Sequence, residues 1–275
     1  MILKKALGQA RGILTENDIE DASLEGELLL RHALDTSRVQ LYLDLHRELS
    51  PEHEEVFWKL IQRRLNGEPS AYITGQREFY GNNYYVNPNV LIPRPESELL
   101  VEEAIHLARQ SNISTIAEIG TGCGAIAISL ALSLPEVRLY ATDISASALK
   151  VARFNAENYA ITDRLYLLEG DMLAPLPEPV DLIVANLPYV RESELPPTGE
   201  PVQALNGGPD GLSKIYDFCH KISGKLSCGG SVLLEIGQGQ GNAVANLLRN
   251  LFPSARIEIT PDLSGIERMV SLRLT

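Results

Sequence analysis

The stretch DLIVANLPYV, residues 181–190, begins like a buried strand and ends on Asn186, Leu187, Pro188 and Tyr189. An amide or exocyclic amine nitrogen is a poor nucleophile because its lone pair is delocalised. Two acceptors that grip its N–H groups, the Asn186 side-chain oxygen and the Leu187 carbonyl, would orient that nitrogen toward an electrophile and stabilise the charge that develops on it. Pro188 would rigidify the turn, and Tyr189 would stack on a planar substrate group. These four residues are our catalytic and substrate-binding candidates.

A glycine-rich stretch, AEIGTGCGAIAISLAL, lies upstream of this motif. Its glycines, Gly120, Gly122 and Gly124, fall between a predicted strand and a predicted helix, where a backbone must turn sharply and approach a ligand closely. Alone the stretch is ambiguous, because the spacing of Gly120, Gly122 and Ala125 also satisfies the dinucleotide fingerprint. An isolated Asn-x-Pro-Tyr would be a plain turn. Together, the two stretches favour a nucleoside site beside a catalytic amide.

Acidic residues near the glycines narrow the choice of nucleotide. Asp143, in the stretch LYATDIS about twenty residues on, ends the second predicted strand, where a carboxylate accepts hydrogen bonds from ribose hydroxyls in either nucleotide class. Glu118 precedes the glycines, where a carboxylate would repel a pyrophosphate but tolerate or attract a cationic amino-acid tail. The alternative is that Glu118 is a solvated residue at the end of a strand. Asp171 would accept from an exocyclic amine, and Met172 would offer an apolar surface to a purine. The set favours S-adenosylmethionine over NAD.

From Pro95 onward the chain alternates between helical and strand patterns. We predict helices over residues 97–109, 125–134 and 146–159, and strands over residues 115–119, 137–142, 165–169, 181–185 and 231–236. This alternation indicates a mostly parallel sheet covered on both faces, with residues 256–260 and 268–274 as an antiparallel pair at its edge. The fourth strand adjoins the first in a doubly wound sheet, which would bring Asn186 next to the glycines. Residues 192–210 read as a long structureless loop, which also favours a site here.

The first seventy or so residues have helical periodicity. Ser50 would cap a helix with Pro51 at its first position, and its apolar face predicts a packed bundle without indicating any chemistry. Aromatic and β-branched residues around Gly81-Asn82 suit a hairpin. We therefore expect a helical domain over residues 1–75, a hairpin linker over 76–93 and an α/β domain over 94–275.

Composition excludes several classes of protein. With 36 acidic and 24 basic residues the net charge is −12, and no basic stripe suits a phosphate backbone, so we expect no direct nucleic-acid partner. No stretch approaches the ~20 apolar residues of a membrane span, and residues 1–9 lack the pattern of a secretion signal. We expect a cytoplasmic protein. The three cysteines lack paired spacing, so neither a disulfide framework nor a metal site is expected.

Taken together, these stretches resemble the HemK family of protein-(glutamine) methyltransferases, which methylate the glutamine of the Gly-Gly-Gln loop in peptide chain release factors. The resemblance covers nearly the whole chain through EPSAYITGQREFYG, VLIPRPESELLVE, EIGTGCGAIAISLA, ATDIS, VANLPYV, EPVQALNGGPDGL, LLEIGQGQG and DLSGIERMV. It implies a five-helix N-terminal domain that docks the release factor, a β-hairpin linker and a seven-stranded, Rossmann-like methyltransferase domain that uses S-adenosylmethionine. We expect a monomer.

The resemblance also implies roles for individual residues. Contacts to S-adenosylmethionine would come from Gly120, Thr121, Gly122, Cys123, Gly124, Asp143, Met172 and Asn186. Residues 186–189 would bind the substrate glutamine, and Arg94 and Glu98 would line or brace the cofactor pocket. The family usually reads Asn-Pro-Pro-Tyr; here Leu187 replaces the first proline but keeps the carbonyl, so the hydrogen bond can survive in a less rigid turn. Ser97 stands where the family more often has threonine.

Two other functions fit parts of the pattern. An amino-methyltransferase acting on adenine in DNA or RNA would use the same asparagine-proline-tyrosine logic, but it needs a flipped base and a basic groove, which the net charge argues against. A non-catalytic adaptor that binds S-adenosylmethionine or a release factor would not need the intact Asn186. Methyl transfer measured with release factor and with DNA as acceptors separates the three.

Overall fold

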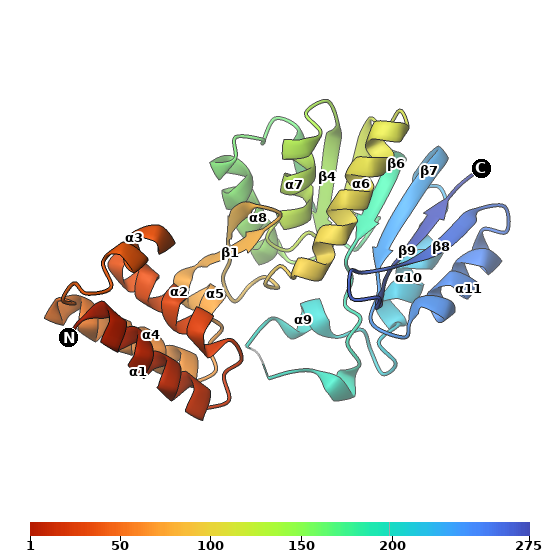
Figure 1. The fold of residues 1–275 in the computed structure, drawn as a ribbon. Helices are drawn as coiled ribbons and strands as arrows, with labels where there is room; N and C mark the ends of the chain where they lie inside the picture. The colour runs from red at the N-terminus through yellow and green to blue at the C-terminus, as the bar shows by residue number, and fades with distance from the viewer. Residues whose placement is uncertain (198) are drawn as a thin grey trace. The chain divides into compact units, whose positions relative to one another are not determined.

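The computed structural model describes residues 1–197 and 199–275, and the chain divides into two compact units, Met1–Gln76 and Arg77–Thr275. The first unit is helical (Figure 1). Its helices are α1 (Leu3–Glu16), α2 (Ala22–Leu34), α3 (Arg38–Leu43), α4 (Pro51–Leu65) and α5 (Ser70–Thr74). They enclose a core of their own that includes Leu14, Leu29, Leu30, Phe57 and Ile61. This is the small N-terminal helical region that the sequence predicted.

Helix α4 begins where the sequence placed its start. The backbone N–H of His53 donates to the Ser50 hydroxyl over 3.3 Å, and Pro51 occupies the first turn, where a missing N–H costs nothing. The Ser50 oxygen also lies 2.8 Å from His53 Nδ1. A capping serine followed by proline therefore fixes this boundary locally.

A β-hairpin follows the helices, formed by β1 (Gln76–Phe79) and β2 (Asn82–Tyr85). Its turn residues are Tyr80 and Gly81, both with positive φ, 49° and 70°, as the tight hairpin turn that matches strand twist requires. The sequence centred this turn one residue later, on Gly81-Asn82. The difference arises because Asn82 Nδ2 donates to the Tyr80 carbonyl over 3.0 Å, while Glu98 Oε1 accepts from the Tyr80 N–H over 2.9 Å.

The second unit contains a seven-stranded sheet of order β5-β4-β3-β6-β7-β9-β8. Its strands are β3 (Thr115–Ile119), β4 (Arg138–Asp143), β5 (Leu165–Glu169), β6 (Val180–Ala185), β7 (Leu226–Glu235), β8 (Arg256–Pro261) and β9 (Glu267–Arg273). All neighbours pair in parallel except β9, which is antiparallel to both β7 and β8. The predicted α/β class, the strand number and the antiparallel edge pair are confirmed. Strand β7 starts earlier than predicted, and its pairing with β6 is irregular between Val180 and Leu182.

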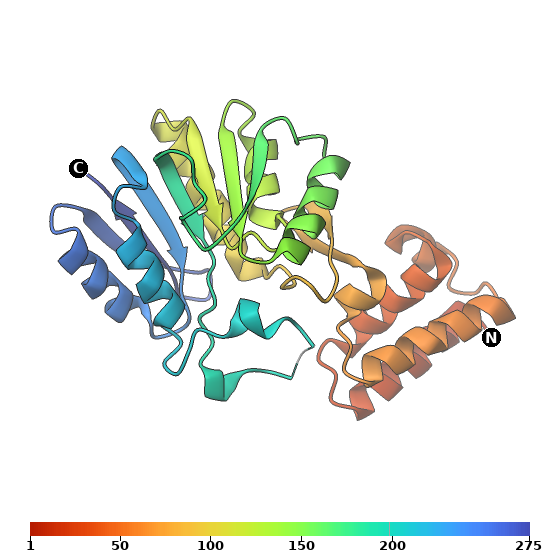
Figure 2. The ribbon, with the colours of Figure 1, turned by 180° about the vertical axis from the view of Figure 1, so that it is seen from behind.

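Helices cover both faces of this sheet (Figures 1 and 2). On one face lie α6 (Glu98–Gln110), α7 (Ala125–Ser133) and α8 (Ala146–Asn158), and on the other lie α10 (Ser213–Lys221) and α11 (Gly241–Leu251), which the sequence analysis did not assign. Among the described residues, no helix is long and apolar enough to cross a membrane. Because the helices cover the two faces of the sheet, polar groups can lie at the amino ends and at the carboxyl ends of the strands.

The segment predicted as a structureless loop over residues 192–210 contains secondary structure among its described residues; Thr198 lies outside them. It contains a 3₁₀ turn (Glu192–Glu194) and the short helix α9 (Val202–Leu205). The chain folds back on itself, because the Val190 N–H donates to the Leu205 carbonyl over 3.0 Å and the Gly207 N–H to the Val190 carbonyl over 2.8 Å. Backbone hydrogen bonds therefore connect this segment to Val190, the residue directly after Asn186–Tyr189, which we call the NLPY motif.

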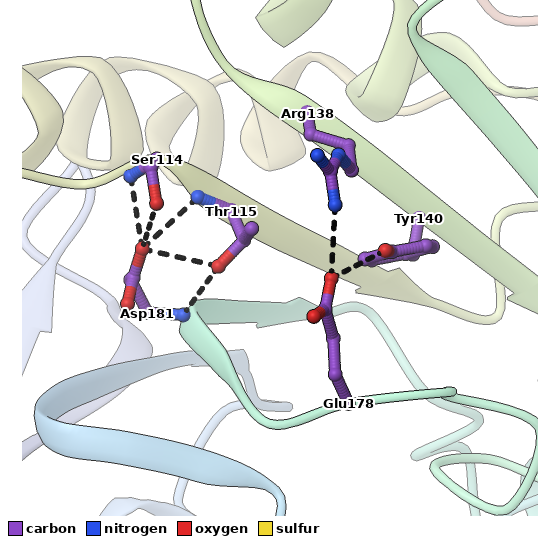
Figure 3. Close-up of polar contacts among 6 residues, drawn as sticks. All are labelled: Ser114, Thr115, Arg138, Tyr140, Glu178 and Asp181. Carbon is purple, nitrogen blue, oxygen red and sulfur yellow. Dashed lines mark hydrogen bonds and ion pairs between the residues drawn. The ribbon is translucent and has the colours of Figure 1, made fainter.

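The amino ends of the central strands are held by carboxylates (Figure 3). Asp181 Oδ2 accepts from the backbone N–H and the hydroxyl of both Ser114 and Thr115, over 2.9 to 3.0 Å. Burial alone would raise the pKa of Asp181, but these hydrogen bonds outweigh it and the pKa lies below its usual value. Glu178 accepts from Tyr140 and Arg138 nearby. The carboxylates at the amino ends of these strands therefore have a structural role. We look for the candidate site at the carboxyl ends.

Candidate active site

The carboxyl ends of β3, β4 and β6 border a cavity in the second unit. Its lining comprises Asn89, Val90, Leu91, Ile119, Gly120, Gly122, Thr142, Asp143, Ile144, Ser145, Ala148, Asp171, Met172, Asn186, Leu187, Pro188, Pro201, Gln203, Ala204 and Lys214. The glycine stretch, Asp143 at the end of β4 and the NLPY motif therefore meet, as the doubly wound topology predicted. A broader groove on the first unit, around Trp58 and Arg63, contains none of these motif residues.

The glycine loop joins β3 to α7 and is tied to β4. Its glycines all have positive φ, and a Cβ on Gly124 would lie 3.0 Å from Ile128 Cδ1 and 3.3 Å from the Ala152 Cβ, so α8 packs directly against the loop. The Gly122 N–H donates to Asp143 Oδ2 over 2.9 Å. Asp143 thus both lines the cavity and fixes the loop that borders it.

Asp143 is held by backbone donors on both of its oxygens. While Oδ2 accepts from Gly122, Oδ1 accepts from the Ser145 N–H over 2.9 Å. Burial raises the pKa of Asp143, and these backbone hydrogen bonds oppose the rise. A carboxylate fixed in this way at a cavity wall can accept hydrogen bonds from the hydroxyls of a ribose.

Glu118 lies behind the loop rather than in the cavity lining. Its side chain is buried, and Oε2 accepts from the Thr121 hydroxyl over 2.5 Å and from the Ala127 N–H over 3.0 Å. Burial raises the pKa of Glu118 to about 8, although both hydrogen bonds favour the charged form. The alternative of a solvated strand end is wrong. The other role expected from the sequence, a direct attraction for a cationic tail, stays a prediction, and the contacts seen here brace the loop.

Three further predicted cofactor residues are also absent from the described lining. Thr121 and Cys123 are buried, and Gly124 serves the packing of α8. Burial raises the pKa of the Cys123 thiol to about 12, so this cysteine is a neutral core group. Their contacts to a cofactor remain predictions. By contrast, the cavity lining does include Gly120, Gly122, Asp143, Asp171, Met172 and Asn186, and their contacts to a cofactor stay predictions as well.

Two lining residues follow strand β5. Asp171 forms an ion pair with Lys221 of α10 over 2.6 Å, and both side chains are partly exposed. Met172 has a positive φ of 48°, uncommon for a side chain of this size, and its carbonyl accepts from the Thr142 hydroxyl over 2.9 Å. This contact links the segment after β5 to the end of β4 and holds the thioether at the cavity wall.

At the end of β6, two oxygen acceptors of the NLPY motif receive no hydrogen bond from the part of the chain that the structure describes. Asn186 Nδ2 donates to the Ser97 hydroxyl over 2.9 Å. Neither Asn186 Oδ1 nor the Leu187 carbonyl accepts a hydrogen bond from any residue that the structure describes. The Leu187 side chain is buried, and its Cδ2 would lie 3.6 Å from a Cβ on Gly120. The arrangement offers a pair of oxygen acceptors beside the glycine loop.

Tyr189 points away from the described cavity lining. Its hydroxyl donates to Glu235 Oε1 over 3.1 Å, and a Cβ on Gly237 would lie 3.1 Å from its ring. Burial, with the nearby Glu235 carboxylate, raises the pKa of Tyr189. These contacts show an anchor for the motif, while the stacking role expected from the sequence stays a prediction.

The stretch NGGPDGL, residues 206–212, packs against the backbone of the NLPY motif. A Cβ on Gly211 would lie 2.5 Å from the Tyr189 carbonyl, closer than real side chains approach, so only glycine fits there. Gln240 Nε2 donates to the carbonyls of Tyr189 and Gly211 over 3.1 and 3.2 Å, while its Oε1 accepts from the Gly237 N–H. The backbone after the motif is therefore clamped between two segments.

Arg94 and Glu98 are absent from the described lining, and their expected role in bracing the cofactor pocket stays a prediction. The Arg94 guanidinium pairs with the buried carboxylate of Glu200, which also accepts from the Ile92 N–H over 3.0 Å. Glu98 holds the hairpin turn at Tyr80. The sequence analysis gave no supporting role to Glu200, Glu235 or Gln240, and it noted Ser97 only as a departure from the family, because nothing in the spacing of these residues indicates that they converge.

Comparisons with known proteins agree with this geometry. Residues 5–75 match the family model of the PrmC N-terminal domain, and residues 95–198 match that of the methyltransferase small domain. The release factor glutamine methyltransferase of Moorella thermoacetica is 42% identical over 274 residues, covering 98% of this chain and 97% of that protein. The corresponding protein of Bacillus anthracis is 36% identical over 282 residues, covering 98% of each.

Solved structures show the same fold at lower identity. A methyltransferase from Pyrococcus furiosus superposes with a TM-score of 0.54 at 17% identity, covering 70% of this chain and 89% of that one. At this identity the likeness concerns the fold alone. The activity is indicated by the family model and the relatives, which are those of methyltransferases.

Proposed function

Since the chain belongs to the family of release factor glutamine methyltransferases, we propose that it methylates the side-chain amide nitrogen of the glutamine in the Gly-Gly-Gln motif of peptide chain release factors. The observation that carries the proposal is a pair of acceptors beside the glycine loop, Asn186 Oδ1 and the Leu187 carbonyl, to which no described residue donates a hydrogen bond. A primary amide has two N–H groups, so it can satisfy both acceptors at once.

The residues of the cavity fit S-adenosylmethionine. Gly120 and Gly122 allow a ligand to approach the backbone, Asp143 suits the ribose hydroxyls, and Met172 and Leu91 offer apolar surface to a purine. When bound, S-adenosylmethionine supplies an electrophilic methyl group. Glu118 and Thr121 would act through the shape of the glycine loop, since they bond to each other behind it.

The NLPY motif would make the amide nitrogen reactive by holding its two N–H groups. With both N–H groups directed to oxygen acceptors, the nitrogen is fixed in one orientation, and positive charge that develops on it is stabilised. Leu187 serves as well as proline here because it contributes a main-chain carbonyl. Pro188 restricts the backbone at the next position, and the Tyr189 hydroxyl anchors the end of the motif on Glu235.

The N-terminal helical unit would dock the release factor, a role that rests on the family resemblance and on the match of residues 5–75 to the PrmC N-terminal domain. Its separate core supports a module that is distinct from the catalytic sheet. Because the proposed substrate is a translation factor, we propose that the protein acts in the cytoplasm, and we propose a monomer.

Methyl transfer from radiolabelled S-adenosylmethionine tests the proposal. Purified release factor should be labelled, and mass spectrometry should locate the methyl group on the glutamine of the Gly-Gly-Gln motif. The matched control is the same factor with that glutamine replaced by glutamate, which should stay unlabelled. Labelling of DNA or RNA instead would indicate the adenine methyltransferase, and binding of the cofactor without transfer to any acceptor would indicate an adaptor.

A further inference from the structure

A buried asparagine of α8 joins two segments that are far apart in the sequence. Asn155 is 1% exposed, and its Oδ1 accepts from the Tyr85 N–H over 2.8 Å. Its Nδ2 donates to the carbonyls of Tyr85 and Cys123, over 2.9 Å each. Tyr85 ends strand β2 of the hairpin, and Cys123 lies in the glycine loop between β3 and α7. One side chain therefore links the hairpin to the loop that borders the cavity.

These three hydrogen bonds fix the orientation of the Asn155 amide. A carbonyl only accepts and a backbone N–H only donates, so Nδ2 must face the two carbonyls and Oδ1 the N–H. The oxygen and the NH₂ group are both satisfied in the protein interior, where such a network makes a rigid connection. Aspartate has the same shape but no N–H group, so it would face both carbonyls with an oxygen.

The glycine loop is held from two sides. At the cavity, the Gly122 N–H donates to Asp143, which is part of the lining. On the side away from the lining, Asn155 holds the carbonyl of the next residue, Cys123. The shape of the loop at the cavity wall therefore depends on a side chain that does not line the cavity.

The hairpin packs on the two helices that follow the glycine loop. The hydroxyls of Tyr84 and Ser129, a residue of α7, share a hydrogen bond of 2.8 Å. The rings of Tyr85 and Phe154, a residue of α8, lie edge to face with their centroids 5.0 Å apart. Neither contact includes a residue of the glycine loop, whereas the hydrogen bonds of Asn155 reach both.

We propose that Asn155 is a positioning residue that couples the hairpin to the glycine loop, so that S-adenosylmethionine bound at the loop stabilises the hairpin, and an ordered hairpin favours cofactor binding. This inference rests on the proposed function, because it takes S-adenosylmethionine as the ligand of the loop. By linkage the coupling is reciprocal. The hairpin begins at Gln76, directly after the N-terminal helices, so the coupling includes the segment that connects the two units in the chain.

Hydrogen exchange of the Tyr85 N–H tests the coupling in the wild-type protein. The reference is the Thr115 N–H, which is bonded to Asp181 at the amino end of β3 and reports general stabilisation by a ligand. Saturating S-adenosylmethionine should slow exchange at Tyr85 at least about fivefold more than at Thr115. Equal slowing at both amides would overturn the coupling, and so would unchanged exchange at Tyr85 in protein that binds the cofactor.

Asn155→Asp removes the link to the glycine loop and keeps an acceptor for the Tyr85 N–H. The Kd of S-adenosylmethionine, measured by calorimetry, should rise at least about fivefold, and the cofactor should no longer slow exchange at Tyr85 relative to Thr115. A folded variant, as judged by thermal melts, that keeps the wild-type affinity and the wild-type slowing would overturn the proposal. The exchange measurement on the wild type decides the question if the variant does not fold.

Ser129→Ala is the matched control, because it deletes another buried hydrogen bond of the hairpin and leaves Asn155 in place. It should lower stability, while the Kd of S-adenosylmethionine stays within about twofold and the cofactor still slows exchange at Tyr85. If Ser129→Ala changed affinity and exchange as much as Asn155→Asp does, the effects would come from a generally loosened hairpin, and the role of Asn155 would be wrong.

These measurements distinguish the coupling from the proposed function. If the wild type methylates release factor but the cofactor does not slow exchange at Tyr85, the coupling is wrong and the proposed function stands. If it methylates no release factor but S-adenosylmethionine slows this exchange as expected, the coupling stands and the proposed acceptor is wrong. A wild-type protein that binds no S-adenosylmethionine would contradict both.

Discussion

The buried carboxylate of Glu118 should make the stability of the protein depend on pH in a range where few carboxylates titrate. Burial raises its pKa to about 8 in the folded protein, whereas an unfolded chain has a glutamate of ordinary pKa, about 4.3. The folded state therefore holds a proton that the unfolded state has already lost. Stability from this group is fully present below the unfolded pKa and is lost as the pH rises through about 8.

The size of the effect follows from proton linkage. One proton released on unfolding changes the free energy of unfolding by about 1.4 kcal/mol per pH unit, and the change tapers near the folded pKa. Between pH 6 and pH 8 the loss is about 2 kcal/mol. For a cooperative unit of the size of residues 77–275, this corresponds to a fall in Tm of about 4–8 °C.

Glu118→Gln removes the titration and keeps an oxygen that can accept from Thr121 and Ala127. Urea unfolding and thermal melts of wild type and variant should be measured at half-unit steps from pH 6 to pH 8.5. As the pH rises, the free energy of unfolding of the wild type should fall relative to that of Glu118→Gln. This trend is expected whichever of the two proteins is more stable at pH 6. Contributions from Asp143 and Glu235 are common to both proteins and cancel in this difference.

Parallel pH dependences of the two proteins would refute the argument, because they would show that Glu118 is ionised in the folded state. Cofactor affinity, measured by calorimetry on the same samples, should change only a few-fold if Glu118 acts behind the glycine loop. A loss of cofactor binding in a folded Glu118→Gln would restore the direct contact to a cationic tail that the sequence suggested.

Three further predictions concern the motif and the N-terminal unit. Asn186→Ala deletes a hydrogen-bond acceptor that acts in the transition state and should lower kcat by about 10² to 10³. Single-turnover methyl transfer measures this loss, with cofactor affinity determined separately. Near-normal turnover would contradict the proposed hydrogen bond from the substrate amide to Asn186. Leu187→Pro keeps the carbonyl and loses no backbone hydrogen bond among the described residues, so turnover should persist. The free energy of unfolding should fall by about 1–2 kcal/mol because the buried leucine side chain is lost. A folded but inactive variant would show that the site uses a different backbone geometry. Deleting residues 1–76 should leave calorimetric binding of S-adenosylmethionine nearly intact and weaken methylation of whole release factor, and equal methylation by the truncated chain would exclude docking by those helices.

The sequence alone determined the features that depend on local pattern. Alternating strand and helix periods indicated the layered sheet, and Ser50 with Pro51 indicated the start of α4, because capping and helix entry involve neighbours in the chain. The glycine loop, Asp143 and the NLPY motif were predicted to converge because the topology of a doubly wound sheet brings the ends of its central strands together. For these residues, type and spacing carry the information.

Only the tertiary structure decided what surrounds each group. The charge of Glu118 suggested a ligand or a solvated strand end, and its actual place under the loop depends on how β3 and α7 pack. Asn186 and Ser97 are 89 positions apart, and Arg94 and Glu200 are 106 apart, so no local periodicity relates either pair. Whether a buried polar side chain serves as ligand or as support depends on which partners satisfy its hydrogen bonds, and those partners are set by the packing of the whole domain.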